Sequence, residues 1–194
     1  MLQIVLIRPG STDYDDDKRI QGTLDIPMNA KGALEVANVV GELADKRIEA
    51  VYAAPCEPTM QTAKSVAKSL GIKHKKLDRM QNLDQGLWQG MRVEDVRRKQ
   101  PKVYRQWQEQ PESVCPPEGE TLSEADERVR VALTRLLKRH KDGVIGLVVS
   151  EPLASLVRRF VSREELGDLW KSPNGHARWE ILRLEPEEVL AQSN

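Results

Sequence analysis

The sequence predicts an α/β fold of three layers, in which helices cover both faces of a mostly parallel sheet. Short apolar segments rich in β-branched residues alternate along the chain with longer amphipathic segments. Several of the short segments are apolar at nearly every position, which is typical of parallel strands buried on both faces. A chain of 194 residues can bury one substantial core, so we expect a single domain over residues 1–194.

Five segments have the composition of strands. They are residues 2–7, 50–53, 72–77, 144–149 and 177–184. The first ends at Arg8, and we expect the chain from there to about Asn29 to be a loop. In the last, strand alternation places Trp179 and Ile181 on one face, with Leu182 and Leu184 on the other.

Six segments have the periodicity or the boundary signals of helices. They are residues 30–46, 59–70, 93–99, 103–108, 123–140 and 153–161. In the first, Leu34, Ala37, Val40 and Leu43 recur at helical spacing and are expected to face the core. In the fifth, Ser123 is the candidate cap.

Ligands of parallel sheets bind at the carboxyl ends of the strands. The loops that follow Arg8, Ala53 and Ser150 are therefore where we expect a site. Residues 78–121, approximately, interrupt the alternation of strands and helices with short helices and a Pro/Glu/Gly stretch. We interpret them as an inserted segment over this end of the sheet.

The charge balance gives no indication of a polyanionic partner. Lys and Arg number 30 and Asp and Glu number 30, and the basic residues are scattered along the chain. We therefore expect no nucleic-acid binding. No apolar stretch is long enough to span a bilayer, and the N-terminal strand lacks the features of a signal peptide, so the expected location is the cytoplasm without a membrane anchor.

Metal and thiol chemistry are also not indicated. His74, His140 and His176 lie far apart in the sequence, so we expect no metal site and no cofactor. Cys56 and Cys115 lack metal-ligand spacing, and neither begins the Cys-x5-Arg loop of cysteine phosphatases. We expect both to be reduced, partly buried thiols.

The loop after the first strand carries a motif that resembles the signature of one family. Residues 6–12 read Leu-Ile-Arg-Pro-Gly-Ser-Thr, similar to the Leu-Ile-Arg-His-Gly-x-Thr of the histidine phosphatase (phosphoglycerate mutase-like) superfamily. Arg19, Gln21 and Gly22 follow at the family's spacing. In the family, the histidine attacks the phosphoryl group, but this chain has Pro9 there, which offers no basic nitrogen.

Four later segments resemble the same family in the same order, so the likeness extends from Leu2 to about Leu184. These segments are residues 51–63, 80–90, 116–121 and 146–152. The resemblance implies that Pro58 stands where the family has a phosphate-binding arginine and that Asn82 replaces its general acid. It also implies that Glu151 replaces a second histidine, so a carboxylate would repel phosphate there.

The resemblance therefore implies the family fold with a degenerate active site. Of the family's five core positions, now Arg8, Pro9, Pro58, Asn82 and Glu151, only Arg8 is retained. We expect a pseudophosphatase that is inactive by the phosphohistidine mechanism and binds a ligand or partner. The alternative is a phosphomonoester hydrolase with altered residues, which would use Asp84, Glu151 or His176 in new roles.

The retained residues suggest what such a domain binds. Arg8, Arg19, Gln21 and Gly22 are weak candidates for binding a small anionic ligand, and a protein partner is the other option. Proteins of this family often form dimers or tetramers, so a homo-oligomer is compatible with the sequence. We further expect Glu151 to face Arg8 at the N-terminus of the helix that begins at Pro152 or Leu153, in the place of the phosphate.

Overall fold

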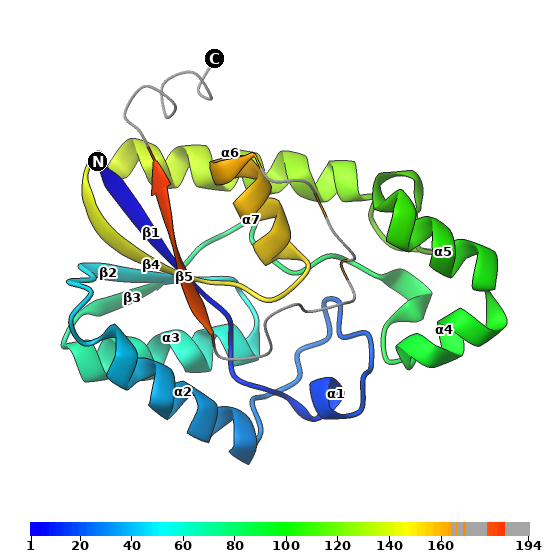
Figure 1. Cartoon of the computed structure of the whole chain (residues 1–194), viewed down its shortest axis with the longest axis horizontal. Helices are drawn as coiled ribbons and strands as arrows, with labels where there is room; N and C mark the ends of the chain where they lie inside the picture. The colour runs from blue at the N-terminus through cyan, green and yellow to red at the C-terminus, as the bar shows by residue number, and fades with distance from the viewer. Residues whose placement is uncertain (164–165, 167–168, 170–177, 185–194) are drawn as a thin grey trace.

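The computed structural model describes residues 1–163, 166, 169 and 178–184, and its centre is a five-stranded sheet (Figure 1). The strands are β1 (Leu2–Ile7), β2 (Ala50–Ala53), β3 (Lys73–Lys76), β4 (Gly143–Val148) and β5 (Trp179–Leu184). Their order is β3-β2-β4-β1-β5. Only β5 runs antiparallel to its neighbour, so the expected α/β fold with a mostly parallel sheet is confirmed.

Helices cover both faces of the sheet in the described part of the chain. They are α1 (Asp13–Asp16), α2 (Ala30–Leu43), α3 (Glu57–Leu70), α4 (Val93–Lys99), α5 (Pro101–Glu109), α6 (Leu122–Arg139) and α7 (Leu153–Ser162), with 3₁₀ turns η1 (Gly86–Trp88) and η2 (Pro111–Ser113). Helices α2 and α3 lie on one face, and α6 and α7 on the other (Figure 1). Each pair closes its own apolar core cluster against the sheet.

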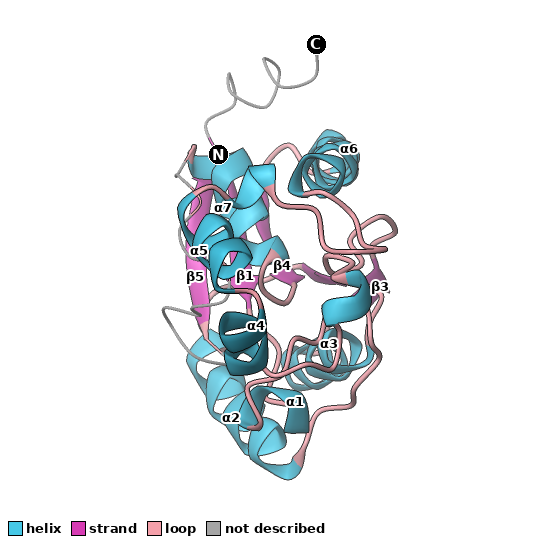
Figure 2. Cartoon of the chain, turned by 90° about the vertical axis from the view of Figure 1, so that its right-hand side faces the viewer, coloured by secondary structure: helices cyan, strands magenta, loops and turns pink. Residues whose placement is uncertain are grey.

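Strands β1 and β4 are neighbours in the sheet, and their register places their carboxyl ends together. Strands β1 and β4 pair in parallel from Leu2 with Gly143 to Ile7 with Val148, so they end at the same level. The chain segments that begin at Arg8 and Ser150 therefore leave the sheet side by side. Helices α4 and α5 lie in front of this edge when the molecule is viewed from their side (Figure 2).

The elements expected from the sequence are present, with bounds shifted by up to three residues among those described. The face assignment of β5 holds, because Leu182 and Leu184 are buried in one core cluster and Trp179 packs against the other. Strand β3 lies at the sheet edge, and its four side chains are exposed. Charged residues on an edge strand discourage pairing with other chains.

The expected buried face of α2 is wrong. Leu34 is 71% exposed, and the buried residues of the helix are Gly32, Val36, Val39 and Leu43. Spacings of four, three and four residues keep these positions on one face, whereas three successive steps of three drift around the helix. Gly32 allows the helix to approach the first loop, because a Cβ there would lie 2.2 Å from the Ser11 carbonyl oxygen.

Two capping boxes also differ from expectation. Helix α6 is capped by Thr121 rather than Ser123, and the Thr121 hydroxyl and backbone both pair with Glu124. The first loop is not entirely irregular, since Thr12 and Asp15 form the same arrangement around α1. In both cases a Thr with an acidic residue three positions later satisfies amides that a helix start leaves unpaired.

The inserted segment packs on the core through aromatic side chains. Trp88 and Trp107 are fully buried and meet edge to face, with their ring centroids 6.1 Å apart. Arg128 of α6 holds the start of the segment, donating hydrogen bonds to the carbonyl oxygens of Arg79 at 2.9 Å and Gln81 at 2.7 Å. No helix within the described ranges is long and apolar enough to cross a membrane.

Candidate functional site

A cavity of about 570 Å³ opens at the carboxyl ends of β1 and β4, between the first loop and the inserted segment. The eight positions that the sequence singled out all border it: Arg8, Pro9, Arg19, Gln21, Gly22, Pro58, Asn82 and Glu151. They come from loops that are far apart in the chain and meet because the parallel strands end at one edge. We call this cavity the strand-end cleft.

The carboxylate of Glu151 faces the guanidinium of Arg8 inside the strand-end cleft. Nη2 of Arg8 donates a hydrogen bond to Oε1 of Glu151. The two side chains are only 6% and 14% exposed, respectively. This pairing confirms the expectation that Glu151 lies opposite Arg8.

Glu151 has three further hydrogen bonds, all from α7. Its Oε2 accepts from the Ser155 backbone N–H at 3.1 Å and from the Ser155 hydroxyl at 2.8 Å. Its Oε1 accepts from Nη2 of Arg158 at 3.1 Å. Ser155 is the third residue of α7, so its amide points out of the helix N-terminus, and the carboxylate lies at the positive end of the helix dipole. These are the interactions that bind anions at helix N-termini.

The charges around Glu151 are balanced by a second carboxylate. Nε of Arg158 donates to Oε1 of Glu180 on β5 at 2.6 Å, so two arginines and two glutamates form one chain of ion pairs. Burial, together with the nearby charge of Arg158 and against the opposing effect of Glu180, lowers the pKa of the Arg8 guanidinium to about 10. Arg8 therefore remains charged at neutral pH, and the carboxylate of Glu151 serves as its counter-ion.

Pro9 and Pro58 contribute buried ring surface to the cleft. Pro9 lies in the turn after β1, where the neighbouring Gly10 amide donates to the Thr62 hydroxyl at 3.2 Å. Pro58 is the second residue of α3, a position where its missing N–H would have no partner in the helix. Both residues suit their backbone positions, and neither offers a side chain that can donate a hydrogen bond or accept a proton.

Asn82 lies on the inserted segment and is 6% exposed. Its Oδ1 accepts a hydrogen bond from the Leu83 amide at 3.0 Å, and its own carbonyl oxygen accepts from Arg128 at 3.2 Å. The side chain is therefore held in place by its own segment and by α6. An amide in this position can bind a ligand but cannot supply a proton as a carboxylic acid would.

The retained residues at the rim are already engaged with the protein. Arg19 donates to the Gly90 carbonyl at 2.8 Å and to Asp17 at 3.1 Å, and Gln21 donates to the Leu24 carbonyl at 3.4 Å. Gly22 has a φ of 55°, and a Cβ there would lie 2.1 Å from Oε1 of Gln89. The local backbone alone therefore accounts for this glycine.

Of the residues considered for altered chemistry, Glu151 is the only described one that borders the strand-end cleft. Asp84 is not among the described residues that line it, and its Oδ1 accepts from the Gly86 amide at 2.8 Å. His176 lies outside the described residues. Burial raises the pKa of the Cys56 thiol, which opposes formation of a nucleophilic thiolate.

The remaining His and Cys residues lie apart from the site. Cys115 is exposed, contrary to the expectation of a partly buried thiol, and His74 is exposed on β3. His140 is half-buried and hydrogen-bonds the Tyr52 hydroxyl at 2.7 Å. In the part of the chain that the structure describes, no three His, Cys, Asp or Glu residues cluster as metal ligands would.

Sequence reasoning missed the α7 residues that complete the site. Ser155 and Arg158 follow Glu151 by four and seven positions, a spacing that places them on one face of a helix. That spacing is visible in the sequence once the helix is assigned. Arg128 and Glu180 have no comparable local signal, because they reach the site from α6 and β5 through tertiary contacts.

Comparison with known families and proteins identifies relatives over most of the chain. The family model described as "Histidine phosphatase superfamily (branch 1)" matches residues 4–193. Phosphoserine phosphatase 1 of Hydrogenobacter thermophilus is 28% identical over 187 residues, which are 95% of this chain and 88% of that protein. The probable phosphoglycerate mutase GpmB of Enterobacter sp. is 30% identical over 154 residues, 79% of this chain and 71% of that protein.

Solved structures share the fold at lower sequence identity. YhfR of Bacillus stearothermophilus superposes with a TM-score of 0.84 at 20% identity, covering 95% of this chain and 92% of YhfR. A mycobacterial glucosyl-3-phosphoglycerate phosphatase in complex with VO3 gives a TM-score of 0.81 at 20% identity and covers 93% of this chain and 90% of that one. These similarities show the same three-layer architecture.

Proposed function

The chain belongs to the histidine phosphatase superfamily, branch 1, and from this premise we propose that it is a pseudophosphatase of that family. It keeps the fold and the strand-end cleft but does not use the phosphohistidine route. Proline at position 9 has no imidazole to attack a phosphoryl group, and this replacement alone closes that route.

The observation that carries the proposal is the set of contacts around Glu151. Its carboxylate accepts hydrogen bonds from Arg8, Arg158 and Ser155, which together resemble the donors of an oxyanion site. A phosphate placed among these donors would have to displace the carboxylate or lie beside it. Repulsion between the two anions in a partly buried site opposes the second arrangement.

The other replacements act in the same direction. Pro58 supplies no guanidinium to the transferred group, and Asn82 supplies no acid for the leaving oxygen. The loss of groups that work together is not the sum of separate losses. The proposal therefore rests on the absent nucleophile and the occupied anion position, and the other two positions support it.

Because Arg8 is paired with Glu151, a ligand of this cleft would have to bind without a contact to Arg8. The rim contributes Lys18 and Arg19, and the floor contributes the amide side chains of Asn82 and Gln85. Gln85 is 2% exposed, and its Oε1 has no hydrogen-bond partner among the described residues. These groups suit a small polar ligand with a weakly held anionic group at the rim.

The second candidate function is a phosphomonoester hydrolase with altered catalytic residues. It is favoured by the relatives, which are named as a phosphoserine phosphatase and a probable phosphoglycerate mutase. It would require Glu151 to leave its four hydrogen bonds, or a group such as Asp84 to turn into the cleft. If the chain is active, phosphatase or phosphomutase chemistry is the class that its family supports.

An assay of phosphate release from p-nitrophenyl phosphate separates the two candidates. We expect the native chain to release phosphate at the rate of the buffer. An Arg8→Gln variant serves to distinguish turnover in the cleft from a contaminating phosphatase. Release that persists in a freshly repurified native chain and that Arg8→Gln abolishes would support the hydrolase and rule out the pseudophosphatase. Release that Arg8→Gln retains in full would identify a contaminating phosphatase.

A further inference from the structure

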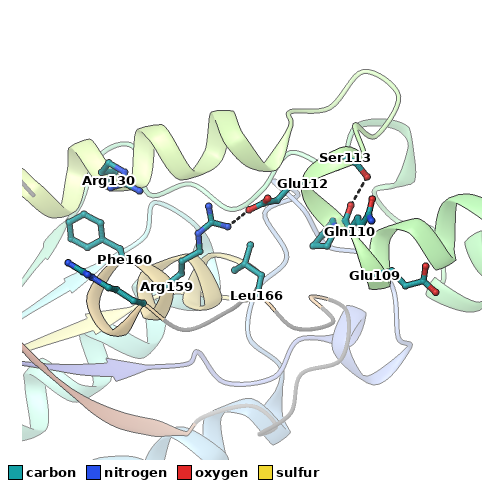
Figure 3. Close-up of a pocket in the computed structure, with 10 residues that line it drawn as sticks. Glu109, Gln110, Glu112, Ser113, Arg130, Arg159, Phe160 and Leu166 are labelled. Atoms are coloured by element: carbon teal, nitrogen blue, oxygen red, sulfur yellow. Dashed lines mark hydrogen bonds and ion pairs between the residues drawn. The ribbon is translucent and has the colours of Figure 1, made fainter.

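A second and larger cavity, of about 820 Å³, lies between the inserted segment and α7 (Figure 3). One wall is formed by the end of α5 and by η2, and the other by α6, α7 and Leu166. We call it the α5–α7 pocket. None of its described lining residues borders the strand-end cleft, so it is a separate site. Its volume lies within the range of roughly 300–1,000 Å³ typical of small-molecule sites.

The two walls of the α5–α7 pocket carry opposite charges. Arg130, Arg159 and Arg163 line the wall of α6 and α7, whereas Glu109 and Glu112 line the wall of the inserted segment. Figure 3 shows Glu112 reaching across the pocket to Arg159, and these two side chains form an ion pair. Among the described residues, Arg163 and Glu109 take part in no ion pair.

Apolar side chains also line the α5–α7 pocket. Phe160 and Leu166 line the pocket on the α7 side, and Pro111 lines it on the side of η2. Phe160 is only 5% exposed, and the guanidinium carbon of Arg130 lies 5.7 Å from its ring centroid. A ligand that fills this pocket therefore meets a cation, an anion and a rigid apolar surface together.

We propose that the α5–α7 pocket binds a zwitterionic ligand of the amino-acid type with an apolar side chain. The carboxylate pairs with Arg159, the ammonium pairs with Glu112, and the side chain packs on Leu166 and Pro111. Such a ligand enters the Arg159–Glu112 ion pair and gives each partner a new counter-ion, so no charge is left unmatched. An anion or a cation alone matches one wall only.

The ion pair that the ligand replaces is weakly held. The side chains of Arg159 and Glu112 are 33% and 55% exposed, and ion pairs exposed to this degree contribute little to stability. Arg159 also lies 4.0 Å from Asp126, so its guanidinium keeps an acidic neighbour when Glu112 separates from it. Opening the pair therefore costs little compared with burial of an apolar side chain.

Isothermal titration calorimetry of the full chain tests the proposal with phenylalanine and two analogues. 3-Phenylpropanoate lacks the ammonium, and phenethylamine lacks the carboxylate. We expect phenylalanine to bind about tenfold more tightly than either analogue, as one lost charged hydrogen bond predicts. Absence of binding by phenylalanine at millimolar concentrations, or equal binding of an analogue, would overturn the proposal.

Variants assign each half of the ligand to its wall. Glu112→Gln should remove the preference for phenylalanine over 3-phenylpropanoate, and Arg159→Gln should remove the preference over phenethylamine. Arg97→Gln is the matched control, because it removes an exposed arginine of an ion pair with Glu94 on α4, outside the pocket.

Both residues of the Arg159–Glu112 pair are exposed enough for the variants to fold, which circular dichroism checks. Preferences that survive in both pocket variants would place the ligand elsewhere and contradict the assignment. The pocket is distinct from the strand-end cleft, so the result does not depend on whether the chain is a pseudophosphatase.

Discussion

Oε1 of Glu151 accepts hydrogen bonds from both Arg8 and Arg158, so one carboxylate oxygen joins the loop after β1 to helix α7. The other oxygen caps the helix through Ser155. A single side chain thus pairs with two arginines and accepts hydrogen bonds from the first turn of α7. This arrangement leads to the predictions that follow.

Glu151→Gln should destabilise the fold because it leaves two largely buried guanidinium groups without their shared anion. The side chains of Arg8 and Arg158 are 6% and 12% exposed, and breaking such a pair lowers the free energy of unfolding by about 3 kcal/mol. Urea denaturation measures the loss. Glu180→Gln is the control, since that carboxylate is 38% exposed and its loss should cost no more than about 1 kcal/mol. Equal effects of the two substitutions would show that Glu151 has no special role.

Restoring the four family residues should restore phosphatase chemistry if the scaffold keeps them in register. The variant carrying Pro9→His, Pro58→Arg, Asn82→Glu and Glu151→His should release phosphate from p-nitrophenyl phosphate at least about 10²-fold faster than the native chain. The triple variant that retains Pro9 is the matched control and should stay at the native rate, because it lacks the nucleophile. Activity of the triple variant equal to that of the quadruple one would argue against a phosphohistidine route.

Two leucines of α2 test the corrected face of this helix. Leu43 is fully buried, and Leu43→Ala should lower the free energy of unfolding by about 3 kcal/mol through lost contacts and a cavity. Leu34→Ala is the same substitution at an exposed position of the same helix and should change it by no more than about 0.5 kcal/mol. Thermal or urea unfolding provides both values. A large effect at Leu34 would restore the face expected from the sequence.

Much of the fold could be predicted from the sequence because β1, β2 and β4 are apolar at nearly every position and the helices are separated by clear breaks. The buried face of α2 could not be predicted in the same way. Gly32 packs against Ser11 because it has no side chain, and an analysis of hydrophobic periodicity does not count a glycine as a buried position. The cap of α6 was missed although Thr121 and Glu124 have the spacing of a capping box.

The candidate site was predicted in its residues but only partly in its interactions. The resemblance to the family indicated which positions would meet, and the Arg8–Glu151 pair followed from opposite charges at two of them. The contributions of Arg158 and Glu180 depend on how α7 packs against β5, which no local pattern encodes. The α5–α7 pocket depends on where the inserted segment lies, and the sequence alone does not specify that placement.

The central claim is that the Glu151 carboxylate occupies the position of an anion in the strand-end cleft. Calorimetric titration with inorganic phosphate tests this claim most directly. The titration compares the native chain with Glu151→Ala, and Glu180→Gln is the control for loss of a carboxylate elsewhere in the same network of ion pairs. We predict no binding to the native chain or to Glu180→Gln at millimolar phosphate, and saturable binding to Glu151→Ala that Arg8→Gln in the same variant abolishes. Saturable binding of phosphate to the native chain that is lost in Arg8→Gln would contradict the claim, as would a folded Glu151→Ala variant that binds none.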